Sequence, residues 1–190
     1  MSLGGGGTLG PVTWPSAEPL TTGDLRLDPL RVADAGEMAG VLADESLYRF
    51  TGGSAPAPSR LRARYRSQVR GASSDGTQGW LNWIVRPEPP GAAVGFVQAT
   101  LERRSRTFED LLVASLGWVV GPVWQGRGIA TRATGAVLEW LVSRGVAEFR
   151  AHIHPDNAAS QKVAAKLGFR PTGLVLDGEI RWVLEVSGSG

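Results

Sequence analysis

The sequence predicts an α/β fold: a single domain with a mixed, mostly antiparallel sheet of about six to seven strands, flanked by four helices. Three observations predict it. Three strand-like segments follow one another between residues 79 and 120, which indicates an antiparallel meander. Two helical patterns then alternate with a strand between residues 128 and 167, which is typical of a crossover connection. The dipeptide Asp177-Gly178 joins the last two strand-like segments as a hairpin.

The first third of the chain is expected to contain a tail, one strand and two helices. Residues 1–17 are rich in Gly, Pro, Ser and Thr and bury too little apolar surface to order themselves, so we expect a disordered tail there. Polar and apolar residues alternate over residues 24–30, which predicts a strand. Residues 33–45 show a short helical pattern. After a Gly- and Pro-rich loop at 51–60, residues 59–72 form an amphipathic helical pattern.

The remaining elements follow from apolar periodicity and turn residues. Strands are expected at 79–86, 92–102 and 110–120, with turns at 87–91 and 103–109. The expected elements after the glycine-containing loop are a helix at 128–143, a strand at 147–153, a helix at 157–167 and strands at 169–176 and 180–186.

Composition excludes several classes of chemistry. The chain has no cysteine, so it has neither a disulfide framework nor a thiolate site. Its only imidazoles are His152 and His154, and we therefore expect no metal. No apolar run reaches the roughly 20 residues of a membrane helix, and the N-terminus lacks the pattern of a signal peptide. The net charge of +2 is too small to indicate nucleic-acid binding. We expect a soluble, cytoplasmic protein without a membrane partner.

The first chemical motif is a glycine loop between a strand and a helix. Gly126 and Gly128 precede the helix N-terminus, where backbone N–H groups lack intrahelical partners and the helix dipole is positive. Glycine lets a phosphate approach these N–H groups, and Arg127 is either a further donor or a solvated side chain. A P-loop would need a lysine after Gly128, and a dinucleotide fingerprint would need Gly or Ala at Thr131. The motif therefore predicts an anion site that is not a P-loop and that matches the dinucleotide fingerprint only weakly.

The second motif lies at the start of the next helix. Asn157 is placed to cap this helix or to reach a ligand, and Ser160 follows one turn later on the neighbouring face. Gly168 ends the helix as a C-terminal cap. Taken alone, Asn157 is a helix cap and Ser160 a surface serine.

Taken together, Gln125-Gly-Arg-Gly-Ile-Ala130, Asn157-x-x-Ser160 and Leu167-Gly-Phe169 resemble the GNAT superfamily of acyl-CoA-dependent N-acyltransferases. Outside these motifs, weaker similarity to the same superfamily spans about residues 22 to 186. The pattern is most similar to the ribosomal-protein-alanine N-acetyltransferase branch. The resemblance implies a GNAT-like fold and an acyl-CoA N-acyltransferase domain at residues 18–187.

The resemblance also implies a site for acetyl-CoA as co-substrate, without a metal. The pyrophosphate would lie on the loop amides, and the pantetheine arm would pair with the preceding strand as an added strand does. A backbone N–H around Val119 would stabilise the oxyanion of the transition state. The residues implied in cofactor binding are Trp118, Val119, Val120, Gln125, Gly126, Arg127, Gly128, Ile129, Ala130, Asn157 and Ser160.

The reaction implied by the resemblance is direct attack of a neutral amine on the thioester in a ternary complex. Many relatives carry a tyrosine that protonates the departing thiolate, seven positions after the asparagine; here Ala164 stands there, and we assign this role to Ser160. For the general base the sequence leaves five alternatives: Glu102, Glu109, Asp110, His154 or water.

Three functions agree with these motifs. The first is acetylation of the N-terminal α-amine of a protein, and the second is acetylation of a small-molecule amine. The third is a catalytically silent acetyl-CoA-binding module. This function stays open because the chain lacks two residues that many relatives carry: the tyrosine after the asparagine, and a glutamate on the strand before the glycine loop. The acceptor, the pathway and the choice between monomer and homodimer stay open.

Overall fold

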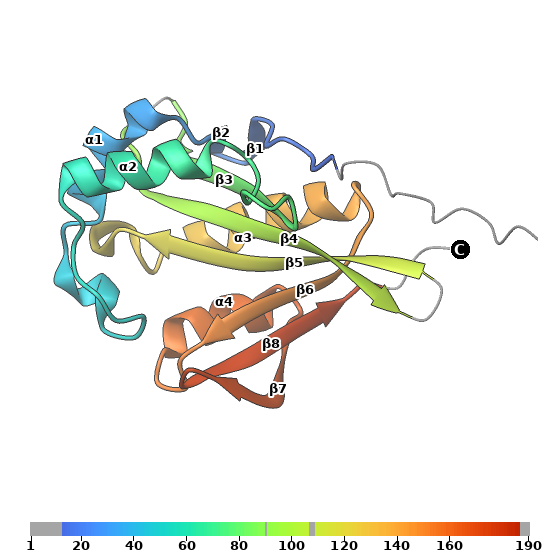
Figure 1. The fold of residues 1–190 in the computed structure, drawn as a ribbon. Helices are drawn as coiled ribbons and strands as arrows, with labels where there is room; N and C mark the ends of the chain where they lie inside the picture. Colours follow the sequence, from blue (N-terminus) through green and yellow to red (C-terminus); the bar gives the residue numbers. More distant parts are fainter. Residues whose placement is uncertain (1–12, 90, 107–108, 187–190) are drawn as a thin grey trace, which may run out of the picture.

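A computed structural model describes residues 13–89, 91–106 and 109–186 (Figure 1). The strands are β1 (Leu20–Thr22), β2 (Leu25–Pro29), β3 (Gln78–Pro87), β4 (Gly95–Arg106), β5 (Glu109–Val120), β6 (Val146–Ile153), β7 (Arg170–Leu176) and β8 (Glu179–Glu185). The α-helices are α1 (Ala35–Val41), α2 (Pro58–Gln68), α3 (Ile129–Val142) and α4 (Ala158–Lys166). Short 3₁₀ turns lie at Val32–Asp34, Glu45–Tyr48 and Pro122–Trp124.

The strands form one mixed sheet in the order β1-β2-β3-β4-β5-β6-β8-β7. Every pair is antiparallel except β5 with β6, which α3 connects. The predicted α/β class, the four α-helices and the mostly antiparallel sheet are confirmed. The sheet has eight strands because a three-residue strand, β1, folds back on β2 through Gly23, whose φ is +56°.

One predicted turn is wrong. We expected a turn at residues 103–109, but β4 continues to Arg106, and Arg103 pairs with Leu112 across the ladder. Charged residues are tolerated here because a long antiparallel hairpin can extend with solvent on its sides. The β4–β5 hairpin therefore reaches beyond the rest of the sheet (Figure 1).

The two faces of the sheet carry separate cores. On one face, α1 and α2 pack through Met38, Leu61 and Tyr65 against Ile84. On the other face α3 and α4 cover a larger core that includes Trp83 and Phe149 (Figure 1). Among the described residues, no helix is both long and apolar enough to cross a bilayer.

The described chain begins with a segment that packs on this core. Trp14, which falls within the predicted tail 1–17, lies against Gly79 and donates through Nε1 to Gly76 O (3.0 Å). The backbone oxygen of Glu18 accepts from Trp83 Nε1 at 2.8 Å. Packing therefore extends upstream of residue 18, whereas residues 1–12 lie outside the described residues.

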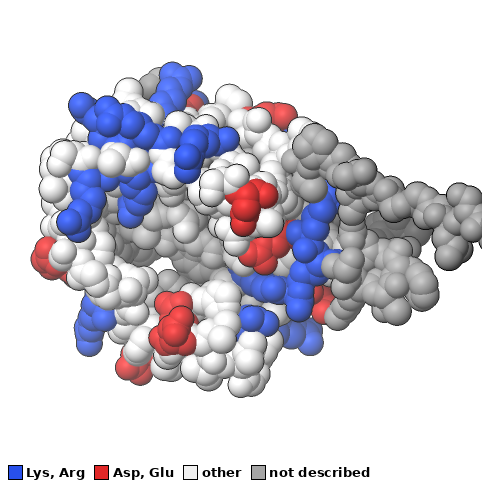
Figure 2. All heavy atoms as spheres, viewed as in Figure 1, with Lys and Arg blue, Asp and Glu red and all other residues white. Residues whose placement is uncertain are grey.

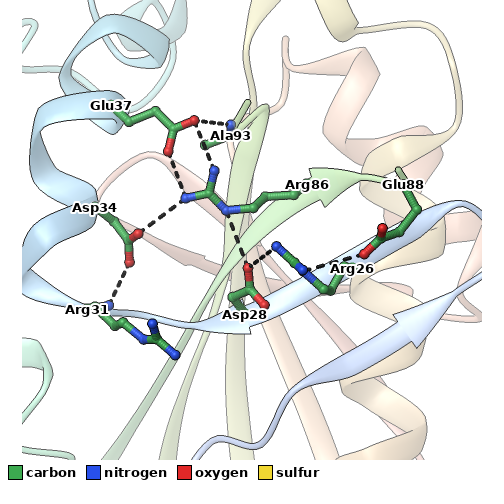
Figure 3. A network of polar contacts seen from close by, with 8 residues as sticks. All are labelled: Arg26, Asp28, Arg31, Asp34, Glu37, Arg86, Glu88 and Ala93. Atoms are coloured by element: carbon green, nitrogen blue, oxygen red, sulfur yellow. Dashed lines mark hydrogen bonds and ion pairs between the residues drawn. The ribbon is translucent and has the colours of Figure 1, made fainter. Parts of the chain in front are cut away.

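An ion-pair network ties α1 to the sheet (Figure 3). At its centre the Arg86 guanidinium contacts Glu37 at 2.7 Å, Asp34 at 3.2 Å and Asp28 at 3.4 Å. Glu37 also accepts from the backbone N–H of Ala93 at 2.6 Å. The Arg86 side chain is only 14% exposed, so solvent screens these contacts weakly. The hydrogen bond from Arg86 holds the pKa of Glu37 below its ordinary value.

Replacing Arg86 with methionine, which has a similar volume, should therefore destabilise the fold. We expect a loss of about 2 kcal/mol at pH 7, because Asp34 and Glu37 are left without their cation and Asp28 keeps only Arg26. A carboxyl whose pKa is lowered in the folded state stabilises above its ordinary pKa, and that stabilisation disappears as the pH falls through the lowered value. Urea unfolding of both proteins at pH 7 and pH 3 checks this: the difference should shrink at pH 3, and an equal difference at both would contradict it.

Candidate active site

The strands β5 and β6 separate at the edge of the sheet where both end. Their pairing is confined to Leu112 through Ser115 on β5, where Ser115 lies opposite Arg150. Beyond this point β5 continues to Val120 beside β4, and β6 continues to Ile153 beside β8. Because β5 and β6 are parallel, the N-termini of α3 and α4, which follow them, lie at this same edge. The chain thus builds a gap between two strands with two helix N-termini beside it.

The hydrogen-bond register decides which backbone groups face the gap. Gly121 N–H donates to Val94 O at 2.8 Å, in the register that pairs β4 with β5. Hydrogen-bonded pairs alternate along an antiparallel ladder, so the N–H and C=O of Val119 point to β4. Those of Trp118 and Val120 point away from β4, and Val120 O indeed accepts from Gln125 Nε2 at 2.9 Å. The N–H of Val119, expected as the oxyanion donor, therefore points to β4. The N–H groups of its neighbours Trp118 and Val120 are better placed to face a ligand in the gap.

The glycine loop leaves an open, donor-rich surface. Gly126 and Gly128 have φ values of +76° and +72°, which only glycine adopts without strain. A Cβ on either would meet no atom of the described chain within 4 Å, so the space above both is open. The first backbone bond of α3 runs from Arg132 N–H to Gly128 O (3.0 Å), which leaves the N–H groups of residues 129–131 without a helical partner.

The charge around this loop suits an anion. The first turn of α3 contains no acidic residue and has no side-chain cap, so the positive end of its dipole is not neutralised. The guanidinium of Arg127 lies 4.9 Å from the centre of the Trp124 ring, a cation–π contact that holds it beside the loop. Geometry and charge at residues 125–130 therefore suit an anion such as a phosphate group.

The N-terminus of α4 brings Asn157 and Ser160 to the same edge. Asn157 Oδ1 accepts from the backbone N–H of Ser160 at 3.1 Å, so Asn157 caps α4. The Ser160 side chain is half-buried, on the first turn of the helix. Ala164, where many relatives carry tyrosine, is completely buried in the core. Ser160 is therefore the hydroxyl that α4 brings to this edge.

A small cavity lies under α2, on the face of the sheet that α1 and α2 cover. It is lined by Leu30, Arg64, Tyr65, Gln68, Asn82, Trp83, Ile84, Phe96 and Gln98. Gln98 lies opposite Gly117 on β5, and a Cβ at Gly117 would come within 3.2 Å of the Gln98 side chain. Figure 2 shows a hollow in the surface between α2 and the strands β6 and β8. Gln98 thus connects the lining of this cavity to β5 on this face of the sheet.

A comparison with known families shows a match to the acetyltransferase (GNAT) domain over residues 24–170, which is most of the chain. The chain belongs to the GNAT acetyltransferase family. The family resemblance expected from the glycine loop and the Asn-x-x-Ser motif is confirmed.

Curated relatives share parts of this GNAT chain. The aminoglycoside N(6')-acetyltransferase type 1 of Salmonella typhimurium is 33% identical over 88 residues, which are 45% of this chain and 61% of the relative. The match therefore spans less than two thirds of that protein.

Solved structures share the GNAT fold. The ribosomal L7/L12 alpha-N-protein acetyltransferase RimL, solved with coenzyme A, superposes with a TM-score of 0.69 at 16% identity, covering 89% of this chain and 98% of that one. RimJ of Mycobacterium smegmatis, solved with a CoA-disulfide, gives a TM-score of 0.66 at 23% identity, covering 88% and 86%.

Two of the expected bases of this GNAT domain are engaged elsewhere, and two are not described. Glu102 accepts from Gln78 Nε2 at 2.7 Å on β3. His154 Nδ1 accepts from the backbone N–H of Asp156 at 3.1 Å, and its ring lies against Phe50. The side chains of Glu109 and Asp110 lie outside the described residues.

The sequence analysis missed His152. Phe149, Ala151 and Ile153 on β6 pack in the core with α3 and α4, so by alternation Arg150 and His152 lie on the opposite face, toward the hollow. Within the described chain, His152 Nε2 is buried and has no hydrogen-bond partner. Burial, followed by the charge of Arg181, lowers the pKa of His152. The strict alternation of residues 149–153 is the signal that would have identified this histidine.

Beside His152, a buried ion pair stiffens β6. Arg150 Nε donates to Glu148 Oε1 at 2.6 Å, and both side chains are about 10% exposed or less. Each partner satisfies the other, so Glu148 is engaged and is not available as a proton acceptor.

Proposed function

We propose that this protein transfers the acetyl group of acetyl-CoA to the N-terminal α-amine of a polypeptide, by direct attack in a ternary complex. The observation that carries the proposal is the gap after Ser115 and Arg150, where the unpaired edge of β5 leads into the glycine loop. An extended pantetheine arm can pair with such an edge as an added strand, while its phosphates lie on the loop amides.

The residues of this chain have separate tasks in binding. Gln125, Gly126, Arg127, Gly128, Ile129 and Ala130 hold the pyrophosphate. The gap-facing N–H and C=O of Trp118 hold the pantetheine arm, and the N–H of Val120 is the oxyanion donor that the sequence motifs placed around Val119. Gln125 fixes the orientation of Val120, because Gln125 Nε2 donates to the Val120 carbonyl oxygen.

The proton of the attacking amine passes to the imidazole of His152, directly or through one water. His152 lies on β6 one alternation beyond Arg150, and Gly117 lies one beyond Ser115 on β5, so the two flank the mouth of the gap. Its lowered pKa keeps the ring neutral near pH 7, which is the form that accepts a proton.

As the tetrahedral intermediate collapses, the Ser160 hydroxyl donates a hydrogen bond to the departing thiolate of coenzyme A, which then takes its proton from water. If Ser160 donates mainly as charge develops, Ser160→Ala should lower kcat about ten- to a hundredfold with little change in acetyl-CoA affinity. Asn157→Ala should instead weaken acetyl-CoA binding and cost about 1 kcal/mol of stability through loss of the α4 cap. Steady-state kinetics with separate binding measurements distinguish the two, and full activity in Ser160→Ala would remove the role of this serine.

A direct test of the proposal compares matched peptides that bear a single free amine. An α-amine has a pKa near 7.7 to 8.0 and a lysine side chain one near 10.4, so a weak base suffices for the first and not for the second. We expect acetylation of the α-amine to be at least tenfold faster at pH 7.5. Equal rates on both amines would contradict the choice of acceptor.

A second candidate is acetylation of a small polyamine, favoured by the 33% identity to an aminoglycoside N(6')-acetyltransferase. An aminoglycoside included in the same assay separates the two, because only the acceptor that the protein uses will be acetylated at an appreciable rate. Tight acetyl-CoA binding with no turnover of any amine would instead indicate a silent binding module.

A further inference from the structure

Positive charge is concentrated in one segment of the chain. Residues 46–74 contain six arginines and no acidic residue, although the whole chain has a net charge of only +2, so the remainder is net negative. Figure 2 shows Lys and Arg side chains gathered over α2, above the hollow. The exposed arginines on and just after α2 are Arg60, Arg62, Arg64, Arg66 and Arg70.

The fold gains nothing from this arrangement. Arg60 and Arg64, like Arg62 and Arg66, are like charges four residues apart on a helix, which is destabilising. The first turn of α2 has no acidic residue to offset them, and no ion pair involves an α2 arginine among the residues that the structure describes. A helix that keeps four uncompensated cations points to a ligand for them.

The row formed by Arg60 and Arg64 is placed beside the acceptor route. Arg64 lines the cavity under α2 together with Gln68, and Arg60 lies one turn earlier on the same side of the helix. The cavity continues to Gln98, which lies over Gly117 at the mouth of the gap. A chain whose amine reaches Gly117 therefore passes along this arginine row.

We infer that α2 binds an acidic polypeptide acceptor, with Arg60 and Arg64 contacting carboxylates that follow closely behind the reacting α-amine. The inference rests on the proposed function and specifies its substrate class. A nucleic acid fits this surface less well, because bases need exposed aromatic rings to stack on, and the one aromatic residue of α2, Tyr65, is buried.

The test uses two peptides that share their first two residues and differ only in Glu or Gln at the next three positions. The wild-type protein should acetylate the acidic peptide with a kcat/KM about three- to tenfold higher at low salt, and this ratio should fall toward one at 0.5 M salt. Arg60→Gln/Arg64→Gln should bring the ratio close to one at low salt. Gln has a helix propensity near that of Arg, so α2 is retained.

The matched control is Arg62→Gln/Arg66→Gln, which removes the same charge from the same helix on residues that do not line the cavity. It should keep most of the acidic preference. A ratio near one in the wild-type protein, with both peptides acetylated, would overturn the inference and leave the proposed function intact. Inhibition of acetylation by a poly-uridine oligonucleotide but not by poly-glutamate would also overturn it, in favour of a nucleic-acid surface.

Discussion

Gly128→Glu should abolish binding of acetyl-CoA, with a loss of affinity of about a hundredfold or more. The substitution acts in two ways. It places a carboxylate in the open space above the loop, where the N–H groups of the first turn of α3 meet the phosphates. It also forces a side chain onto a backbone with φ of +72°, which costs about 1 kcal/mol or more. Titration calorimetry with acetyl-CoA measures the loss.

Gly145 offers a matched control for this experiment. It follows α3 at the opposite end, has a φ of +84°, and a Cβ there would likewise meet nothing within 4 Å. Gly145→Glu therefore introduces the same charge and a similar backbone strain away from the loop, and it should bind acetyl-CoA normally. If both variants bind normally, the glycine loop is not the anion site.

His152→Gln should lower kcat/KM about a hundred- to a thousandfold at pH 7, the range typical of a lost general base. The charged groups around His152 are Arg150 on β6 and Arg181 and Glu179 on β8. The lowered pKa keeps the imidazole of wild-type His152 neutral at pH 7. The rate advantage of this base is therefore present at pH 7 and is lost as the pH falls through its lowered pKa.

The pH profile separates a chemical role of His152 from a structural one. The deficit of His152→Gln should narrow above pH 9, where the amine is deprotonated without help. A deficit constant from pH 6 to 9.5 would instead indicate damage to the site. His154→Gln is the control, because His154 is the other histidine of the chain and is engaged with Asp156; it should change the rate less than about threefold, as is usual for a residue outside the chemistry.

The parts of the site that could be predicted from sequence are those with a local physical cause. Gly126 and Gly128 are recognisable because a positive φ before a helix favours glycine, and both have one. Asn157 is recognisable because a helix needs a cap, and it provides one. Each of these inferences uses only a few neighbouring residues.

The parts that local sequence could not decide depend on distant strands. Whether Val119 or Val120 faces the gap is decided by the hydrogen bond between Gly121 and Val94, more than twenty residues apart. The lowered pKa of His152 depends first on its burial in the folded sheet and then on Arg181, which the β6–β8 pairing brings opposite it. The turn expected at 103–109 failed because pairing between β4 and β5 overrides local polarity.

The alternation along β5 also divides the amides of one strand into two kinetic classes. Gly117 and Val119 donate within the ladder to β4, so their hydrogens should exchange with deuterium only when the sheet opens. Trp118 and Val120 face the gap, and their hydrogens are held by no strand until a ligand occupies it. Deuterium uptake at these two amides would therefore report cofactor occupancy directly, in an assay that needs no knowledge of the amine acceptor.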